Sequence, residues 1–399
     1  MKTLKIGFFG NTNNYPFMLA RACRRLGHDV EVIINRAEPL HRPEFRYDDI
    51  QCPYPEWIHD IPLRREVDIC VPNRNLRKAI RILKACDVVI LNEFGPALQT
   101  RIGRPSLALL TGSDLGCLAS PEFPKTASDA VTASPVWLKR PISRALWSRT
   151  VGLQREGIQQ SRLIYHFWRG IVPASDAILD ELGVRPERWI FRYISDVMQL
   201  PFTPPPNNRP LRTFCATRLT WTRPPKPGTH ELDLKGSDVM IRGLGMFYRK
   251  TKQKLDVQLV RKGLDIKETE DLVIKEGIGE LVSWSNEITQ RECWERYRQA
   301  DILFEHFGKG MLGMAAVDGM AIGRPVIANG RPEVLETNLG VKSPICQATT
   351  PEEVCAHLER LTADSEWRAR VGAESRKFVE TQFAADAVSR TILERLTSG

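Results

Sequence analysis

Two series of alternating strand and helix patterns, separated by one proline-rich break, constrain the fold of this chain more than any other feature. In the first series strands are predicted at residues 4–9, 29–34, 87–91, 106–111 and 189–193, and helices at 15–26, 73–85 and 174–182. Apolar strands that alternate with helices are typical of parallel sheets covered by helices on both faces. We therefore predict a doubly wound α/β domain in this half.

The break lies near residue 200, where Pro201, prolines at 204–206 and Pro210 make a helix or a central strand hard to continue. After it, strands are predicted at residues 212–216, 255–260, 281–284, 301–304 and 325–328, helices at 236–248, 266–276, 289–298 and 313–322, and a helical tail at 351–396. A length of 399 residues suits two domains. We expect a first domain at 1–200, a linker at 201–210, a second domain at 211–380, and a helix at 381–399 that crosses back to the first domain.

The composition limits the cellular compartments and the classes of binding partner that suit this chain. No run approaches the ~20 apolar residues that span a bilayer, and the start of the chain lacks a signal-peptide apolar region, so we expect a cytoplasmic protein. Nine scattered cysteines without a Cys-x-x-Cys motif favour reduced thiols over disulfides or structural zinc. A formal charge of +9 predicts attraction to nucleic acid, a membrane surface or a phosphorylated ligand.

Two cations are expected at the carboxyl end of the second predicted sheet. Arg218 follows the first strand of that domain, and Lys235 precedes Gly236 at the start of the next helix. A glycine at a helix start allows a close approach of the backbone, and the helix N-terminus offers N–H donors to phosphate. The pair is therefore a candidate diphosphate site. The alternative is a surface arginine and a Lys-Gly turn.

Asp318 is a carboxylate in the first turns of an otherwise apolar predicted helix. Such a carboxylate is stabilised by the helix dipole and is rarely without a partner. An ionised carboxylate only accepts hydrogen bonds, which suits the two hydroxyls of a ribose. The alternative is an aspartate that caps the helix or forms a salt bridge.

Together, residues 235–238 (Lys-Gly-Ser-Asp) and 317–327 (Val-Asp-Gly-Met-Ala-Ile-Gly-Arg-Pro-Val-Ile) resemble matching segments of the large, mostly retaining glycosyltransferase family of GT-B fold. That family includes sucrose synthases and bacterial cell-envelope glycosyltransferases. The resemblance implies two Rossmann-like domains that face each other across a cleft. It also implies that Arg218 and Lys235 contact the diphosphate of a nucleotide sugar and that Asp318 holds the ribose. Because these cations can neutralise the diphosphate, we expect that no metal or cofactor is needed.

The family pattern places a glutamate eight residues before the position of Asp318, where this chain has Gly310. We interpret Gly310 to Gly313 as a phosphate-facing loop, and Glu305 or His306 as the contact to the donor sugar. In the first domain the resemblance covers three short segments: Gly10, residues 26–30 and residues 111–114. The last of these ends in Asp114, which the resemblance places in the cleft.

Glu93 is an independent candidate, because it lies at the carboxyl end of a predicted strand, where it can handle the proton of an acceptor. The alternative is a solvated loop acid. The stretch at 134–155 is basic, with Lys139, Arg140, Arg144, Arg149 and Arg155 among Trp137, Leu138, Ile142, Leu146 and Trp147. Such a helix can lie on an anionic membrane surface, which would make the protein peripheral on the inner face of a membrane, or it can pack its apolar stripe on the domain core.

The sequence therefore predicts a glycosyltransferase that moves a sugar from a nucleoside diphosphate donor to an envelope, polysaccharide or glycolipid acceptor, with the anomeric configuration retained. One alternative is a nucleotide-sugar epimerase on the same fold, and another is a nonenzymatic scaffold that binds nucleotide or membrane. A Rossmann oxidoreductase is disfavoured because residues 7–13 do not form Gly-x-Gly-x-x-Gly, and nucleic-acid binding has no motif beyond charge.

Overall fold

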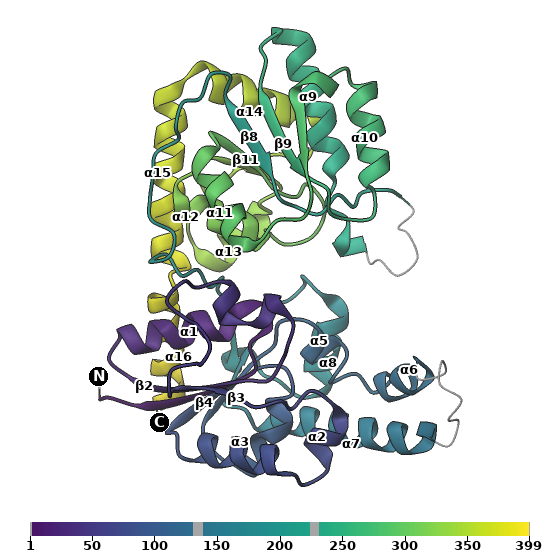
Figure 1. Ribbon diagram of the computed structural model, residues 1–399, viewed down its shortest axis with the longest axis vertical. Helices are drawn as coiled ribbons and strands as arrows, with labels where there is room; N and C mark the ends of the chain where they lie inside the picture. The colour runs from purple at the N-terminus through teal and green to yellow at the C-terminus, as the bar shows by residue number, and fades with distance from the viewer. Residues whose placement is uncertain (1, 131–138, 224–230, 399) are drawn as a thin grey trace. The chain divides into compact units, whose positions relative to one another are not determined.

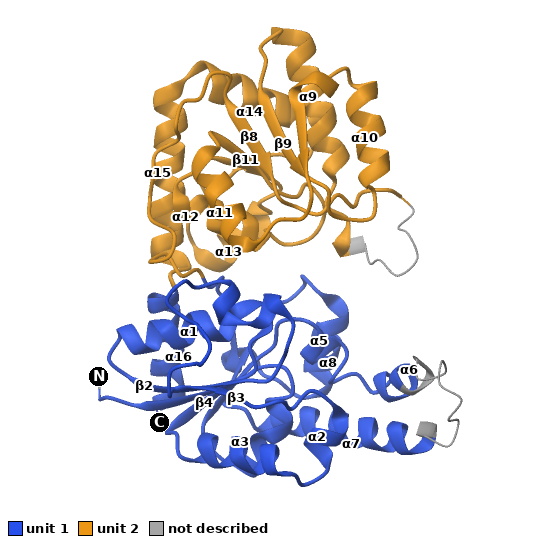
Figure 2. Ribbon diagram, in the orientation of Figure 1, with its two compact units in different colours: residues 1–194, 385–399 blue, residues 195–384 orange. Residues whose placement is uncertain are grey.

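The chain forms two compact α/β units in a computed structural model that describes residues 2–130, 139–223 and 231–398 (Figure 1). Unit 1 comprises residues 1–194 and 385–399, and unit 2 comprises residues 195–384 (Figure 2). The proline-rich segment at 201–210, predicted as a linker, thus belongs to unit 2. Its backbone is held there by Arg324, a fully buried residue whose guanidinium donates to the carbonyl of Thr203 at 2.7 Å.

In the described part of unit 1 a seven-stranded sheet has the order β3-β2-β1-β4-β5-β6-β7. All its strand pairings are parallel. Its strands are β1 (Lys5–Phe9), β2 (Asp29–Ile34), β3 (Ile58–Asp60), β4 (Val88–Leu91), β5 (Ser106–Leu109), β6 (Leu163–Tyr165) and β7 (Trp189–Ile190). The order is that of a Rossmann sheet, extended by one strand.

The helices of unit 1 form the layers on this sheet (Figure 1). They are α1 (Tyr15–Arg25), α2 (Glu66–Cys70), α3 (Arg74–Lys84), α4 (Gln99–Ile102), α5 (Ser113–Gly116), α6 (Phe123–Ala130), α7 (Lys139–Gln160), α8 (Pro173–Glu181) and α16 (Ala385–Thr397). Apolar side chains of β1 and β4 pack with Leu76 and Leu83 of α3 in one buried cluster. The C-terminal helix α16 lies against α1, so this end of the chain is part of unit 1.

In the described part of unit 2 a six-stranded parallel sheet has the order β10-β9-β8-β11-β12-β13, again a Rossmann order. Its strands are β8 (Arg212–Cys215), β9 (Asp256–Val260), β10 (Val282–Ser285), β11 (Ile302–Phe304), β12 (Val326–Ala328) and β13 (Cys346–Gln347). Its helices are α9 (Ser237–Thr251), α10 (Ile266–Lys275), α11 (Gln290–Gln299), α12 (Met314–Ile322), α13 (Pro332–Leu339), α14 (Pro351–Ala363) and α15 (Ser365–Gln382).

Two parallel doubly wound units confirm the predicted fold class. The order of strands reverses direction between β1 and β4 in unit 1 and between β8 and β11 in unit 2. In doubly wound sheets ligands bind beyond the carboxyl ends of the strands at such a switch point. None of the helices in the described ranges combines the length and apolar character that crossing a bilayer requires.

Candidate functional site

Lys235 lies where the loops after β8 and β11 meet, at the switch point of unit 2. Its backbone N–H donates to the carbonyl of Thr220 at 2.6 Å, and its carbonyl accepts from the N–H of Phe307 at 2.6 Å. The chain then enters α9 through Gly236, which has φ +65°. A side chain at Gly308 would place its Cβ 2.0 Å from the carbonyl oxygen of Leu234. The close approach of these loops therefore requires glycine, and it fixes Lys235 over the carboxyl edge of the sheet.

The ammonium of Lys235 is close to the loop that begins with Glu305. A Cβ built on Gly310 would lie 3.9 Å from Lys235 Nζ. Burial lowers the pKa of Lys235, the charge of Glu305 opposes that shift, and the charge of Arg218 adds to it. Arg218 itself is exposed. In the part of the chain that the structure describes, neither cation forms an ion pair, so both can receive an anion.

Glu305 and His306 form the base of this loop, and both are buried. Glu305 accepts from the backbone N–H of Gly313 at 3.0 Å and from Thr217 Oγ1 at 3.3 Å. His306 Nε2 bonds to the carbonyl of Met311 and lies 3.6 Å from Glu305 Oε2. The two side chains thus fix the conformation of the loop at 305–313, and Gly313, the residue before α12, lies against the Glu305 carboxylate.

Asp318 lies in α12 with its carboxylate directed to α11. Its Oδ2 accepts from Trp294 Nε1 at 2.9 Å and from Gln290 Nε2 at 3.1 Å. The side chain is 1% exposed. The structure therefore gives Asp318 two hydrogen-bond donors on the neighbouring helix α11.

In unit 1, Asp114 is fully buried at the start of α5. It accepts from the backbone N–H groups of Thr111 and Gly112, both at 2.8 Å, and from Asn92 Nδ2 at 2.9 Å. Burial raises the pKa of Asp114 to about 6, although the two backbone donors act in the opposite direction. This carboxyl group therefore titrates close to neutral pH.

Glu93 follows β4 at the switch point of unit 1 and is 2% exposed, so the alternative, a solvated loop acid, is wrong. Its backbone has φ +55°, an uncommon value for a residue with a side chain. Glu93 Oε1 accepts from the N–H of Asn11 at 3.2 Å and from Thr12 Oγ1 at 3.1 Å, and Oε2 lies 3.2 Å from Arg36 Nε. Such strain in a fully ordered carboxylate is common at functional sites.

Gly10 follows β1 directly, beside this acid, with φ +80°, and a Cβ there would lie 2.8 Å from the carbonyl oxygen of Asn92. Gln154 of α7 connects the two acid-bearing loops, because its Nε2 donates to the carbonyls of Glu93 at 2.8 Å and Asp114 at 3.0 Å. Sequence reasoning missed Asn92 and Gln154. Asn92 carried a signal, since it directly precedes Glu93 at a strand end, but nothing in the sequence marks Gln154.

The structure thus forms two groups from the predicted site residues. Arg218, Lys235, Glu305, His306, Gly310 and Gly313 gather at the switch point of unit 2, and Gly10, Glu93 and Asp114 gather at that of unit 1. Asp318 is held by α11 instead. Within the residues described, no group of three His, Cys, Asp or Glu side chains could hold a metal ion.

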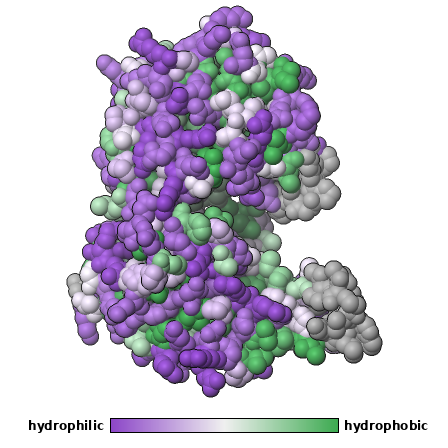
Figure 3. Space-filling view, in the orientation of Figure 1, coloured by the Kyte–Doolittle hydropathy of each residue, from purple (hydrophilic) through white to green (hydrophobic). Residues whose placement is uncertain are grey.

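The basic segment forms the greater part of α7. Trp137 and Leu138 lie outside the described residues. Trp147 does not lie on the solvent-facing side as the membrane interpretation requires, because its ring packs edge-on against Phe123 with centroids 5.0 Å apart. Arg144, Arg149 and Ile142 are exposed, and Ile142 is 64% exposed. Figure 3 shows hydrophobic residues gathered on the visible face over α2 and the neighbouring part of α7.

Residues 232–378, most of unit 2, match the family model described as glycosyl transferases group 1. The matched segment contains Lys235, Glu305 and Asp318 together with the loops that position them. No curated protein matches the chain at a significant level.

Several solved structures share the architecture over both units. The HepE protein of Anabaena in complex with UDP-glucose has a TM-score of 0.60 and 14% identity, over 99% of this chain and 100% of that chain. A glycosyltransferase from Rickettsia africae has a TM-score of 0.57 and 13% identity, over 99% and 98%. A UDP-N-acetylglucosamine 2-epimerase assigned in Listeria monocytogenes has a TM-score of 0.53 and 11% identity, over 100% and 96%. At these identities the likeness establishes the fold, which is GT-B.

Proposed function

We propose that this protein is a glycosyltransferase that uses a nucleoside diphosphate sugar as donor. The observation that carries the proposal is the pair Arg218 and Lys235, two cations at the switch point of unit 2 that form no ion pair within the described ranges. Lys235 lies within the segment that matches the group 1 glycosyl transferases. A diphosphate there would also meet the N-terminus of α9, which begins at Ser237.

The chemistry follows from where charge develops. As the bond between sugar and diphosphate breaks, negative charge accumulates on the leaving group, and preorganised cations stabilise that charge more than they stabilise the intact donor. Burial of Lys235 increases this effect, because a buried ammonium gains more from an anionic partner than a solvated one. We propose that these protein cations neutralise the diphosphate without a metal, so that a chelator leaves activity unchanged.

The acids of unit 1 are proposed to serve the acceptor. Glu93 is ordered by Asn11, Thr12 and Arg36 and can orient an acceptor hydroxyl or take its proton. Asp114 titrates nearer neutral pH and is connected to Glu93 through Asn92 and Gln154. Retention of the anomeric configuration and an envelope, polysaccharide or glycolipid acceptor are the expectations to test first.

UDP-sugars are the first donors to test, because the Anabaena protein of similar fold was solved with UDP-glucose. Calorimetry should show UDP binding to the wild type and weaker binding to Lys235→Ala and Arg218→Ala. Lys254→Ala is a matched control, since Lys254 is an exposed lysine 3.5 Å from Glu280, remote from the switch point in sequence. Equal affinity in all four proteins would overturn the assignment of this site.

The Listeria protein of similar fold, which is assigned as an epimerase, makes epimerisation the second candidate. Incubation with donor alone separates the two functions. An epimerised donor without acceptor would favour the epimerase, transfer that requires an acceptor would favour the transferase, and binding without turnover would favour a scaffold.

A further inference from the structure

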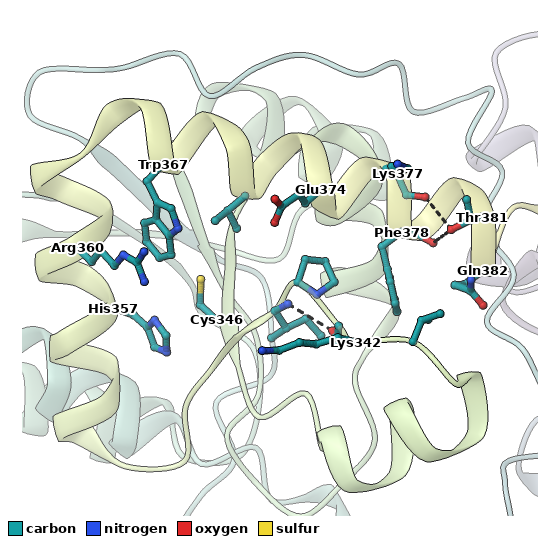
Figure 4. Close-up of a pocket in the computed structure, with 15 residues that line it drawn as sticks. Lys342, Cys346, His357, Arg360, Trp367, Glu374, Lys377, Phe378, Thr381 and Gln382 are labelled. Carbon is teal, nitrogen blue, oxygen red and sulfur yellow. Dashed lines mark hydrogen bonds between the residues drawn. The ribbon is translucent and has the colours of Figure 1, made fainter.

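A pocket in unit 2 lies beyond the edge strand β13, between the loop at 341–346 and the helices α14 and α15 (Figure 4). Its volume is about 630 Å³, which is within the range of about 300–1,000 Å³ typical of small-molecule sites. β12 separates β13 from β11 in the sheet. None of the lining residues belongs to the site around Lys235, so the two sites are distinct.

One end of this pocket is basic. Lys342, His357 and Arg360 line it, and Figure 4 shows the side chain of Lys342 extending toward the other two. His357 is positioned by the hydrogen bond from its Nε2 to the carbonyl of Gln347 at 2.8 Å. In the described residues no carboxylate forms an ion pair with Lys342 or Arg360. Unpaired cations that converge on one cavity favour an anionic ligand.

The wall beside these cations is aromatic and apolar. The guanidinium of Arg360 lies 3.9 Å from the centroid of the Trp367 ring, which fixes its plane by a cation–π contact. Val371 and Phe378 continue this wall along α15, and both are largely buried. A stacked guanidinium presents its N–H edge in a fixed direction, so it is preorganised for an oxyanion.

The geometry points to a second ligand site, in which Arg360 and Lys342 bind a phosphate or carboxylate and Trp367, Val371 and Phe378 contact a ring-sized apolar body. The ligand class is a small amphipathic anion. Glu374 is the carboxylate among the lining residues, and it would oppose the anion. This site does not depend on the function proposed for the Lys235 site.

The probe is 1-naphthyl phosphate, and calorimetry measures its binding to the full chain. Inorganic phosphate and 1-naphthol are measured for comparison. The wild type should bind 1-naphthyl phosphate more tightly than either comparison. Arg360→Gln combined with Lys342→Gln should weaken binding about tenfold or more. Glu374→Gln should tighten it about two- to fivefold, because a like charge is removed. Lys235→Ala should leave the affinity unchanged, and an excess of UDP should not displace the probe.

Opposite shifts from Arg360→Gln and Glu374→Gln exclude a general loss of structure as the cause, and thermal unfolding checks each variant. Arg360→Lys keeps the charge and removes the planar stack, so it should weaken binding even in a fully folded protein. The proposal is overturned if the probe does not bind, if UDP displaces it, if the charge variants leave its affinity unchanged, or if inorganic phosphate binds equally well.

Discussion

The indole Nε1–H of Trp294 donates a 2.9 Å hydrogen bond to Oδ2 of Asp318. The bond joins α11 to α12 and orders a buried carboxylate inside the segment that matches the group 1 glycosyl transferases. Trp294 is therefore proposed as a positioning residue for Asp318, which remains our candidate for the ribose of the donor. Both roles can be separated by substitution.

Asp318→Asn should weaken nucleotide binding, because an amide has one acceptor oxygen where the carboxylate has two. It should also lower the free energy of unfolding by about 1–3 kcal/mol, since Trp294 and Gln290 then donate to a neutral amide oxygen instead of a charged carboxylate oxygen. Calorimetry with UDP and urea unfolding measure the two effects. Trp294→Phe should reduce affinity less than Asp318→Asn does. A destabilised Asp318→Asn protein that binds UDP normally would make the aspartate purely structural.

Lys235→Ala should weaken nucleoside diphosphate binding by about 1.5–3 kcal/mol, the range for a charged hydrogen bond. The pH dependence gives a sharper test. Burial lowers the pKa of the free Lys235, and a bound diphosphate raises it again, so binding takes up protons where the free lysine is partly neutral. Affinity should therefore begin to fall at a pH below the ordinary lysine value of 10.5. Lys235→Arg should abolish this fall, because arginine stays charged.

Asp114 should contribute a pH-dependent term to stability. Its pKa is raised from 3.8 to about 6 in the folded protein, so this contribution is fully present below pH 3.8 and is lost as the pH rises through 6. The loss is on the order of 3 kcal/mol. Urea unfolding at several pH values should show the difference between wild type and Asp114→Asn changing by this amount across the interval. A constant difference would contradict a raised pKa.

Gln154→Ala should lower kcat more than it lowers donor affinity, because Gln154 holds the carbonyls of Glu93 and Asp114 and touches no residue of unit 2 among its described hydrogen bonds. Loss of this buried amide should also cost about 1–3 kcal/mol of stability. Gln160→Ala on the same helix is the control, since Gln160 is exposed and bonds to Glu156. Equal kcat values in the two variants would show that Gln154 does not position the acids of the site.

The exposed basic side of α7 should bind anionic lipid. Arg144 and Arg149 are exposed beside Ile142, and each cation near an anionic surface contributes about 1 kcal/mol at low salt. Wild type should co-sediment with anionic but not neutral liposomes, and glutamine at positions 139, 140, 144 and 149 should abolish this with little change in thermal unfolding. Equal sedimentation with both lipids would favour a soluble acceptor, and unfolding of the variant would favour a packed helix.

Much of the fold could be predicted from the sequence. The strands at the centres of both sheets are apolar runs followed by helical periodicity, and this pattern is local. The short edge strand β13 and the short strands β3 and β6 were missed, because two or three residues carry no period of their own. In the candidate site, Lys235 and Gly236 were visible because a helix start has a local signature. The burial of Glu93 could not be predicted from the sequence, since loops that follow strands are usually exposed.

The sequence by itself determined two doubly wound units and the positions along the chain where the candidate phosphate-binding residues lie, because hydrophobic periodicity and turn residues shape the backbone through neighbours close in sequence. The tertiary structure alone decided which side chains meet. Asp318 bonds to Trp294, which lies 24 residues before it in the sequence, and Gln154 bonds to Glu93, which lies 61 residues before it. Arg360 stacks on Trp367 at the pocket next to β13. Such partners depend on how helices pack on a sheet, and packing is fixed by the shape of the whole core rather than by local sequence.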